Sequence, residues 1–133
     1  MKTLFADTAF YVALVSSRDE LHERAVELAH GSRATIVTTE YVLVELGNRL
    51  ARSGDKLAYL NVVRQAQSDR RTVIVWASRV LYEQALDLYA HRLDKRWSIT
   101  DCTSFVIMQE RGMVEALTTD HHFEQAGFVA LLK

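Results

Sequence analysis

Four carboxylates interrupt or end apolar runs of this chain, and they are its strongest chemical signal. Asp7, Glu45, Asp101 and Asp120 lie in the segments FADTAF, VLVELGN, SITDCTSF and ALTTDHHF. An ionised carboxylate beside packed Val, Leu and Phe must be protonated, paired with a cation or bound to a metal. Several carboxylates gathered in one place favour a hard divalent cation. The sequence therefore predicts a metal site if the fold brings these acids together.

Each acid also has a purely structural explanation. Asp7 and Asp120 can cap the helices that follow them, since Asp is a favoured N-cap residue. Glu45 can pair with Arg49 one turn further along a helix. Asp101 stands three residues after a serine, which matches a capping box. Taken singly, none of the four positions decides between capping and metal binding.

The elements that must position the acids are those of an α/β domain. Short apolar runs alternate with longer helical patterns, so we expect a single domain over residues 1–133 with about five buried parallel strands. The predicted strands are Thr3 to Ala6, Thr35 to Thr38, Thr72 to Trp76, Glu115 to Thr118 and Phe128 to Leu131. Helices are expected between them, including Asp55 to about Ser68, an amphipathic helix capped by Ser78, and Thr100 to Arg111.

This arrangement predicts where the acids meet. Ligands of a parallel sheet gather beyond the carboxyl ends of its strands. Asp7 follows the first predicted strand and Asp120 follows the fourth. Glu45 lies about two turns into the helix after the second strand, and Asp101 is at the start of a later helix. We therefore expect three or four of the acids at one edge of the sheet.

Charge and composition limit the classes of partner. The chain has 16 basic and 17 acidic residues and a net charge of -1, so any nucleic-acid binding must be local. Arg49, Lys95 and Arg96 are the candidate RNA contacts, although all three can equally lie on solvated helix faces. Trp97 can stack a base or close the core. We expect a cytoplasmic protein without a membrane span, because the single Cys102 excludes an internal disulfide and no uncharged run of about 18 residues occurs.

Three further side chains are expected outside the site. His121 and His122 can ligate a transition metal, but a carboxylate-rich pocket favours harder ions, and Phe123 beside them is expected to anchor into the core. Cys102 is expected to pack rather than to act as a nucleophile.

Four motifs make the chain resemble PIN-domain proteins of the VapC toxin type over essentially its whole length. They are the strand ending in Asp7 and Thr8, the helix TEYVLVELGN at residues 39–48, the segment WSITDCTSF at residues 97–105, and LTTDHHF at residues 117–123. The third motif is the most specific. The resemblance implies a three-layer α/β/α fold with a central parallel sheet, and an acidic pocket that binds Mg2+ or Mn2+ and cleaves RNA. It assigns the family's acidic positions to Asp7, Glu45, Asp101 and Asp120, and its supporting polar positions to Thr8 and Ser104.

The implied function is that of a metal-dependent endoribonuclease, the toxin of a type II toxin-antitoxin pair. A divalent ion held by carboxylates can offset the charge of a phosphodiester and lower the pKa of a bound water. In-line attack by that water leaves a 5'-phosphate and a 3'-hydroxyl. We expect Asp7 and Asp101 to be the most direct ligands, with Glu45 and Asp120 binding through water, holding a second ion or orienting the nucleophile. One ion and two ions are both compatible with the sequence.

The same resemblance implies two protein partners. Proteins of this type form dimers and are held inactive by a small antitoxin, whose flexible segment wraps the toxin and can place a basic side chain in the acidic pocket. Residues 11–15 and 57–63 carry more apolar side chains than one core-facing stripe needs, which is compatible with such interfaces or with well-buried helices.

Two other classes of protein remain open from the residues. A receiver-like α/β domain also groups acids at strand ends, but it needs a Lys on a later strand, and the only Lys or Arg residues after Asp101 are Arg111 and Lys133. A non-catalytic module that binds metal structurally would show stabilisation by Mg2+ without turnover.

Overall fold

Five short parallel strands form the centre of the protein. The structure is a computed structural model that describes residues 2–31 and 33–133. Its strands follow the order β3-β2-β1-β4-β5 across one sheet, and every neighbouring pair is parallel. The strands are β1 (Thr3–Ala6), β2 (Thr35–Thr39), β3 (Thr72–Val75), β4 (Glu115–Leu117) and β5 (Val129–Ala130).

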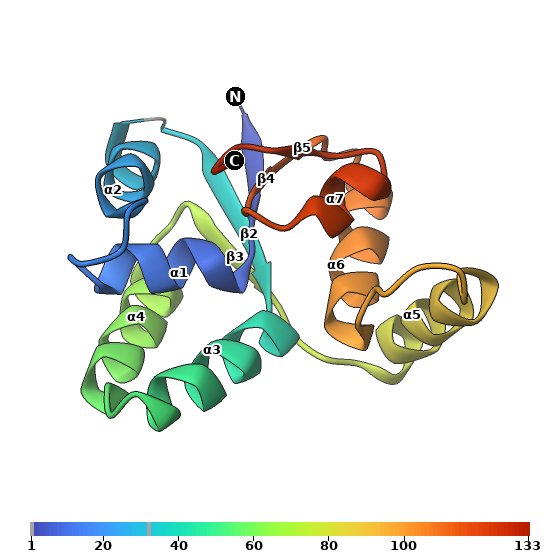
Figure 1. The fold of residues 1–133 in the computed structure, drawn as a ribbon, viewed down its shortest axis with the longest axis horizontal. Helices are drawn as coiled ribbons and strands as arrows, with labels where there is room; N and C mark the ends of the chain where they lie inside the picture. The colour runs from blue at the N-terminus through green and yellow to red at the C-terminus, as the bar shows by residue number, and fades with distance from the viewer. Residues whose placement is uncertain (1, 32) are drawn as a thin grey trace.

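Helices cover both faces of this sheet. Over the described residues they are α1 (Thr8–Val15), α2 (His22–Gly31), α3 (Glu40–Arg52), α4 (Lys56–Ser68), α5 (Arg79–His91), α6 (Ile99–Glu110) and α7 (His121–Gln125). Figure 1 shows α1 to α4 gathered on one side of the strands and α5 to α7 on the other. The prediction of a three-layer α/β/α fold with a parallel sheet of about five strands is confirmed.

The central strand β1 explains why its sequence is apolar without alternation. Leu4, Phe5 and Ala6 are all buried, because helices cover both faces of the sheet and strands flank both edges of β1. Ala6 pairs with Leu117 of β4, so the last residue of β1 lies beside the last residue of β4. This register brings the residues that follow the two strands to the same edge.

The core on the α6 side is built from aromatic rings. Phe105 packs edge-on against Phe123, with ring centres 4.9 Å apart, and against Trp97, with ring centres 5.0 Å apart. Trp97 is 6% exposed, and its indole N–H donates a hydrogen bond to the side-chain oxygen of Gln125 at 3.0 Å. Trp97 therefore closes the core and is not free to stack a base, while Phe123 is the core anchor that the sequence predicts.

The predicted element boundaries differ from the observed ones by one or two residues. β3 ends at Val75, so Trp76 is outside the strand and 52% exposed. β4 ends before Thr118, and β5 keeps only Val129 and Ala130 because it pairs on one side only, with a strand of three residues. The helix expected from Thr100 begins one residue earlier. Each of these boundaries depends on where strand pairing or a helical turn ends. The apolar pattern of the sequence does not mark that point.

Among the described residues, no helix combines the length and the apolar character that crossing a membrane requires.

Candidate metal centre

Asp7 comes directly after β1 and is buried at the edge of the sheet. It occupies the N-cap position of α1, yet its side chain makes no capping hydrogen bond. Its carboxylate is instead held by Thr118, whose hydroxyl donates to Oδ2 at 2.9 Å. The residue is only 8% exposed. Helix capping therefore does not account for a carboxylate at this position.

Glu45 reaches the site from the third helix. The hydroxyl of Thr8, the first residue of α1, donates to Glu45 Oε1 at 2.6 Å. The expected alternative, an ion pair of Glu45 with Arg49, is not among the ion pairs of the described residues. Thr8 thus links the helix after β1 to the helix after β2 through the Glu45 carboxylate.

Asp101 has both a structural role and a place in the site. The Ser98 N–H donates to Asp101 Oδ2 at 3.0 Å, and the Asp101 N–H donates to the Ser98 hydroxyl at 2.9 Å, which completes the predicted capping box. The same Oδ2 lies 3.1 Å from His122 Nδ1. Within the part of the chain that the structure describes, Oδ1 takes part in no hydrogen bond, so the cap leaves one carboxylate oxygen available.

Asp120 is tied to Asp7 through one hydroxyl. The Asp120 N–H donates to Thr118 Oγ1 at 3.0 Å, and Thr118 in turn donates to Asp7. The Asp120 side chain accepts the His122 N–H at 2.9 Å, so the predicted cap of α7 is present. Thr118 is fully buried at the end of β4 and fixes the relative position of two of the four acids.

Burial and neighbouring charges raise the pKa values of the two buried acids. Burial raises the pKa of Asp7 to about 6, and the charges of Asp101 and Glu45 add to the rise. Burial also raises the pKa of Asp101, with a further contribution from the charge of Asp120. The structure therefore brings all four predicted acids into one cluster at the carboxyl edge of the sheet.

The donor set suits a divalent cation. Among the described residues, no Lys or Arg nitrogen lies within 4.0 Å of any of the four carboxylates, and only the imidazoles of His121 and His122 do. Asp7 and Asp101 are buried, Asp120 is half-buried and Glu45 is exposed. Threonine hydroxyls hold two of these carboxylates, with Thr118 donating to Asp7 and Thr8 donating to Glu45. Oxygen ligands with this excess of negative charge are what Mg2+ and Mn2+ bind in proteins.

Several predicted residues do not join the cluster. Ser104 is fully buried, but its hydroxyl donates to the carbonyl one turn back in α6 at 3.1 Å. Lys95 lies 3.9 Å from Asp94, and Arg96 is exposed. Arg49 is exposed one turn beyond Glu45 and lines a separate pocket near the end of α1. The structure therefore gives Ser104 a contact within its own helix and leaves the basic residues at the periphery.

Two residues of the site were missed by the sequence reasoning. Thr118 is buried directly after β4, whereas the sequence predicts it as the last residue of that strand. His122 was set aside with His121, although the Asp120 cap turns His122 toward Asp101. A signal for Thr118 was present, because hydroxyl residues lie within two positions of an acid at a strand end both here and at Asp7-Thr8.

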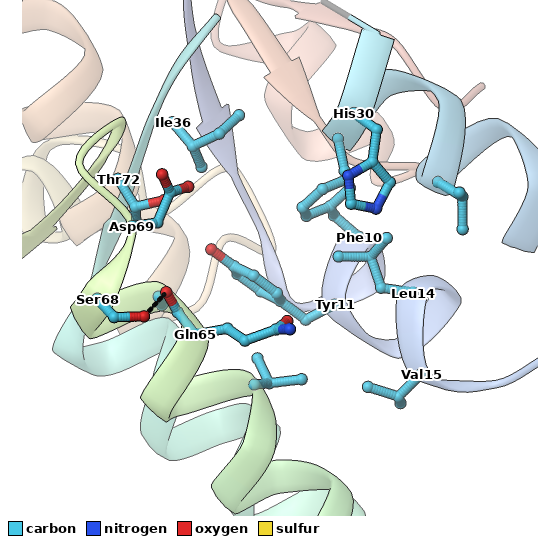
Figure 2. Close-up of a pocket in the computed structure, with 14 residues that line it drawn as sticks. Phe10, Tyr11, Leu14, Val15, His30, Ile36, Gln65, Ser68, Asp69 and Thr72 are labelled. Atoms are coloured by element: carbon cyan, nitrogen blue, oxygen red, sulfur yellow. Dashed lines mark hydrogen bonds between the residues drawn. The ribbon is translucent and has the colours of Figure 1, made fainter. Parts of the chain in front are cut away.

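A pocket of about 370 Å3 adjoins the cluster. It is lined by Glu40, Tyr41, Val44, Glu45, Asn48, Ala77 and Thr100. Glu40 accepts the Ala77 N–H at 2.8 Å and joins α3 to the segment after β3. A larger groove of about 490 Å3 between α1, α2 and α4 contains none of the four acids (Figure 2), and Tyr11 reaches into it from α1. Of the four acids, Glu45 alone lines the smaller pocket.

Fold and site together define a class of protein: an all-parallel α/β domain with a carboxylate centre for a divalent cation at the carboxyl edge of its sheet. The chain belongs to the PIN domain family, whose match covers residues 4–129.

Two named relatives and one solved structure agree with this assignment. The chain is 31% identical over 127 residues to the 23S rRNA-specific endonuclease VapC20 of two Mycobacterium tuberculosis strains, CDC 1551 and H37Rv, with 95% of each chain covered. It also matches the crystal structure of M. tuberculosis VapC20, described as a sarcin-ricin loop cleaving toxin, with a TM-score of 0.86 and 26% identity over 96% of this chain and 98% of that one. The predicted likeness to PIN-domain proteins of the VapC type is confirmed.

Proposed function

We propose that this protein is a Mg2+- or Mn2+-dependent endoribonuclease and the toxin of a type II toxin-antitoxin pair. The observation that carries the proposal is the cluster of Asp7, Glu45, Asp101 and Asp120, which has no Lys or Arg within 4.0 Å among the described residues. The relatives support the enzyme class, because the matched M. tuberculosis protein is named an endonuclease and a toxin.

The proposed roles of the four acids follow from how deeply each one is buried. Asp7 and Asp101, the two buried acids, would hold the ion, while Glu45 and Asp120 are placed to bind its water ligands or to orient the nucleophile. When bound, the divalent ion supplies charge compensation for the phosphodiester and a water of lowered pKa. Thr118 fixes the relative position of Asp7 and Asp120, because its single hydroxyl contacts both residues.

The proposed products follow from this arrangement. The site holds an acceptor-rich surface that can orient a water for in-line attack on a phosphorus atom. Such attack leaves a 5'-phosphate and a 3'-hydroxyl, and it does not use the 2'-hydroxyl of RNA as a nucleophile. End-labelling of the cleavage products distinguishes this chemistry from a metal-independent mechanism that would leave a 2',3'-cyclic phosphate.

Four chains in parallel test the function. Wild type, Asp7→Asn and Asp101→Asn are incubated with a panel of RNAs in Mg2+, in Mn2+ and in EDTA, with Asp55→Asn as a control acid at the exposed start of α4. We expect cleavage only by wild type and the Asp55 variant, and only with metal. Equal activity of all four chains, or activity in EDTA, would contradict the assignment. Stabilisation by Mg2+ without cleavage of any RNA would support the alternative of a metal-binding module.

Ribosomal RNA is the substrate we propose first. The named relative is specific for 23S rRNA, and the chain covers 95% of its length. A ribosomal substrate would also place the action of this protein in the cytoplasm. Incubation with intact ribosomes and with transfer RNA compares the two substrates directly, and cleavage confined to transfer RNA would remove this proposal without affecting the nuclease assignment.

The RNA strand is proposed to contact the basic residues near the Asp101 motif. Arg96 is exposed and Lys95 is half-buried immediately before Trp97, the first residue of that motif. Arg49 lies on α3 one turn past Glu45, so it can reach phosphates only at a distance from the reacting bond. Exposed Lys and Arg side chains of this kind contribute a salt-dependent share of affinity.

We also propose two protein partners. An antitoxin segment with a basic side chain would complement the four acids, which have no Lys or Arg partner of their own among the described residues. A homodimer would cover apolar residues that remain on the surface, since Leu57 of α4 is 69% exposed and Leu60 is 45% exposed. Tyr11, by contrast, is buried and belongs to the core. Light scattering tests the dimer, and a strict monomer over a wide concentration range would contradict it.

A further inference from the structure

Two imidazoles stand beside the carboxylate cluster, although the proposed chemistry needs neither. Asp120 Oδ1 lies 3.3 Å from His122 Nδ1 and 3.7 Å from His121 Nδ1. The possible ligand atoms of Asp120, His121 and His122 all lie within 4.8 Å of one another. His122 Nδ1 is also 3.1 Å from Asp101 Oδ2. The side chains of Asp120, His121 and His122 therefore converge at one side of the cluster, and Asp101 contacts this group through His122.

The spacing of these atoms matches that of ligands around a small transition ion. Ligands about 2.0 to 2.1 Å from a tetrahedral ion lie roughly 3.3 Å from one another. The contacts of His122 Nδ1 with the two carboxylates, at 3.1 and 3.3 Å, already have this spacing, and the contact of His121 Nδ1 with Asp120 exceeds it by a few tenths of an ångström. Asp120, His121 and His122 could supply three ligands of a tetrahedral ion, with water in the fourth position.

The fold holds these side chains in place before any ion binds. The Asp120 carboxylate accepts the His122 N–H, which keeps it facing the imidazoles. Phe123, the next residue, is fully buried and fixes the first turn of α7. The His122 side chain is 19% exposed and that of His121 is 62% exposed, so one imidazole is held by the protein and the other can receive an ion from solvent.

The nitrogen ligands decide which ion this site selects. Carboxylates and water suit Mg2+, whereas imidazole suits Zn2+ and other late transition metals. We propose that Asp120, His121 and His122 form a Zn2+ site that overlaps the Mg2+ site. The two sites share Asp120, so Zn2+ would inhibit Mg2+-dependent cleavage. This last consequence rests on the proposed nuclease function.

Zn2+ binding is measured first, without any substrate. Isothermal titration with Zn2+, and the visible absorption of Co2+ as a spectroscopic substitute, are compared for wild type, His121→Ala and His122→Ala. His91→Ala is the matched control, because His91 also lies beside an aspartate, with Nδ1 3.5 Å from Asp87, but has no second imidazole. Circular dichroism verifies the fold of each variant, and the exposed His121 gives a variant that can be interpreted even if His122→Ala does not fold.

The expected result is one Zn2+ per chain in wild type and in His91→Ala. Loss of either site histidine should weaken binding at least about tenfold, the lower end of the loss seen when even an outer partner of a metal ligand is removed. Equal Zn2+ affinity in wild type and His121→Ala, or binding abolished by His91→Ala, would overturn the site. Failure of the nuclease proposal would appear separately, as a chain that binds Zn2+ but cleaves no RNA in Mg2+.

The competition is then tested on cleavage. In excess Mg2+, added Zn2+ should inhibit wild type and should inhibit His121→Ala only at a concentration about tenfold higher. Zn2+ that binds stoichiometrically without reducing cleavage would overturn the shared-ligand arrangement.

Discussion

Replacing Asp7 with Asn should stabilise the protein when no metal is present, although it removes one of the two proposed metal ligands. The pKa of Asp7 rises from its ordinary 3.8 to about 6, chiefly because of burial. At about 1.36 kcal/mol per pKa unit, this rise corresponds to about 3 kcal/mol against the ionised carboxylate in the folded state. Asn can still accept the hydrogen bond from Thr118, but it loses one acceptor. We therefore expect a net gain of about 1 to 3 kcal/mol in the free energy of unfolding.

The gain should depend on pH in a defined direction. Because the pKa of Asp7 is raised by folding, the folded protein holds this proton more tightly than the unfolded chain. Below pH 3.8 the carboxyl is protonated in both states and costs nothing, and the cost appears as the pH rises toward about 6 and is complete above it. At pH 4.5 the ionisation of Asp7 still destabilises the folded state by about 1 kcal/mol, compared with about 3 kcal/mol at pH 8. The stability advantage of Asp7→Asn over wild type should therefore shrink by about 2 kcal/mol between pH 8 and pH 4.5.

Urea unfolding in EDTA measures this difference. With an m-value of about 1.5 kcal/mol/M, the midpoint of Asp7→Asn should lie roughly 1 to 2 M above that of wild type at pH 8 and much nearer to it at pH 4.5. Comparison of the two chains at each pH cancels the titration of their other groups. Adding Mg2+ should stabilise wild type more than the variant, because only wild type keeps the full ligand set. A variant that is less stable than wild type at pH 8 in EDTA, or a difference independent of pH, would refute the reasoning.

Three other substitutions test separate parts of the site. Thr118→Val should lower the free energy of unfolding by about 1 to 3 kcal/mol in urea titrations, because the buried Asp7 carboxylate loses a donor; an unchanged midpoint would contradict this. Ser98→Ala removes half of the capping box of α6 and should cost about 1 kcal/mol by the same measurement, and no loss would show that Asp101 alone sustains the helix start. Arg96→Ala should raise KM for RNA with kcat unchanged in steady-state cleavage assays, whereas a fall in kcat would place Arg96 at the reacting phosphate.

Each of these substitutions has a matched control in the chain. Thr119→Val changes an exposed threonine beside Thr118 and should leave stability within about 0.5 kcal/mol of wild type. Ser78→Ala removes an N-cap that accepts only the Leu81 N–H, so it separates the cost of a simple cap from that of the capping box. Arg70→Ala alters an exposed arginine before β3, at the opposite edge of the sheet, and should leave KM unchanged.

The fold could be predicted because burial on both faces gives parallel strands a distinctive sequence. Runs such as TLFA and TIVT are apolar or small throughout, and the amphipathic segments between them can only be crossover helices. The ends of the elements could not be predicted to the residue. Trp76 and Thr118 continue an apolar or β-favouring pattern past the last paired residue, and only the strand pairing shows where the ladder stops.

The acids could be located from sequence because each one departs from its apolar surroundings. Their contacts could not, because a hydrogen bond such as that from Thr8 to Glu45 joins residues 37 positions apart. The same limit applies to His122, whose approach to Asp101 depends on the angle at which α7 leaves the sheet. Capping and metal binding were weighed as alternatives, yet at Asp101 one carboxylate oxygen serves the cap and the other stays available.

This double use of Asp101 has a consequence for relatives that have lost enzymatic activity. In a relative that no longer cleaves RNA, an acid at position 101 would still stabilise the protein, because it completes the capping box at the start of α6. It would gain stability by replacing Asp7, whose burial brings no capping bond in return. Degenerate members of the lineage should therefore lose the first acid early and keep the third. An intact Asp101 is consequently poor proof of an active enzyme, and an intact Asp7 is the better marker.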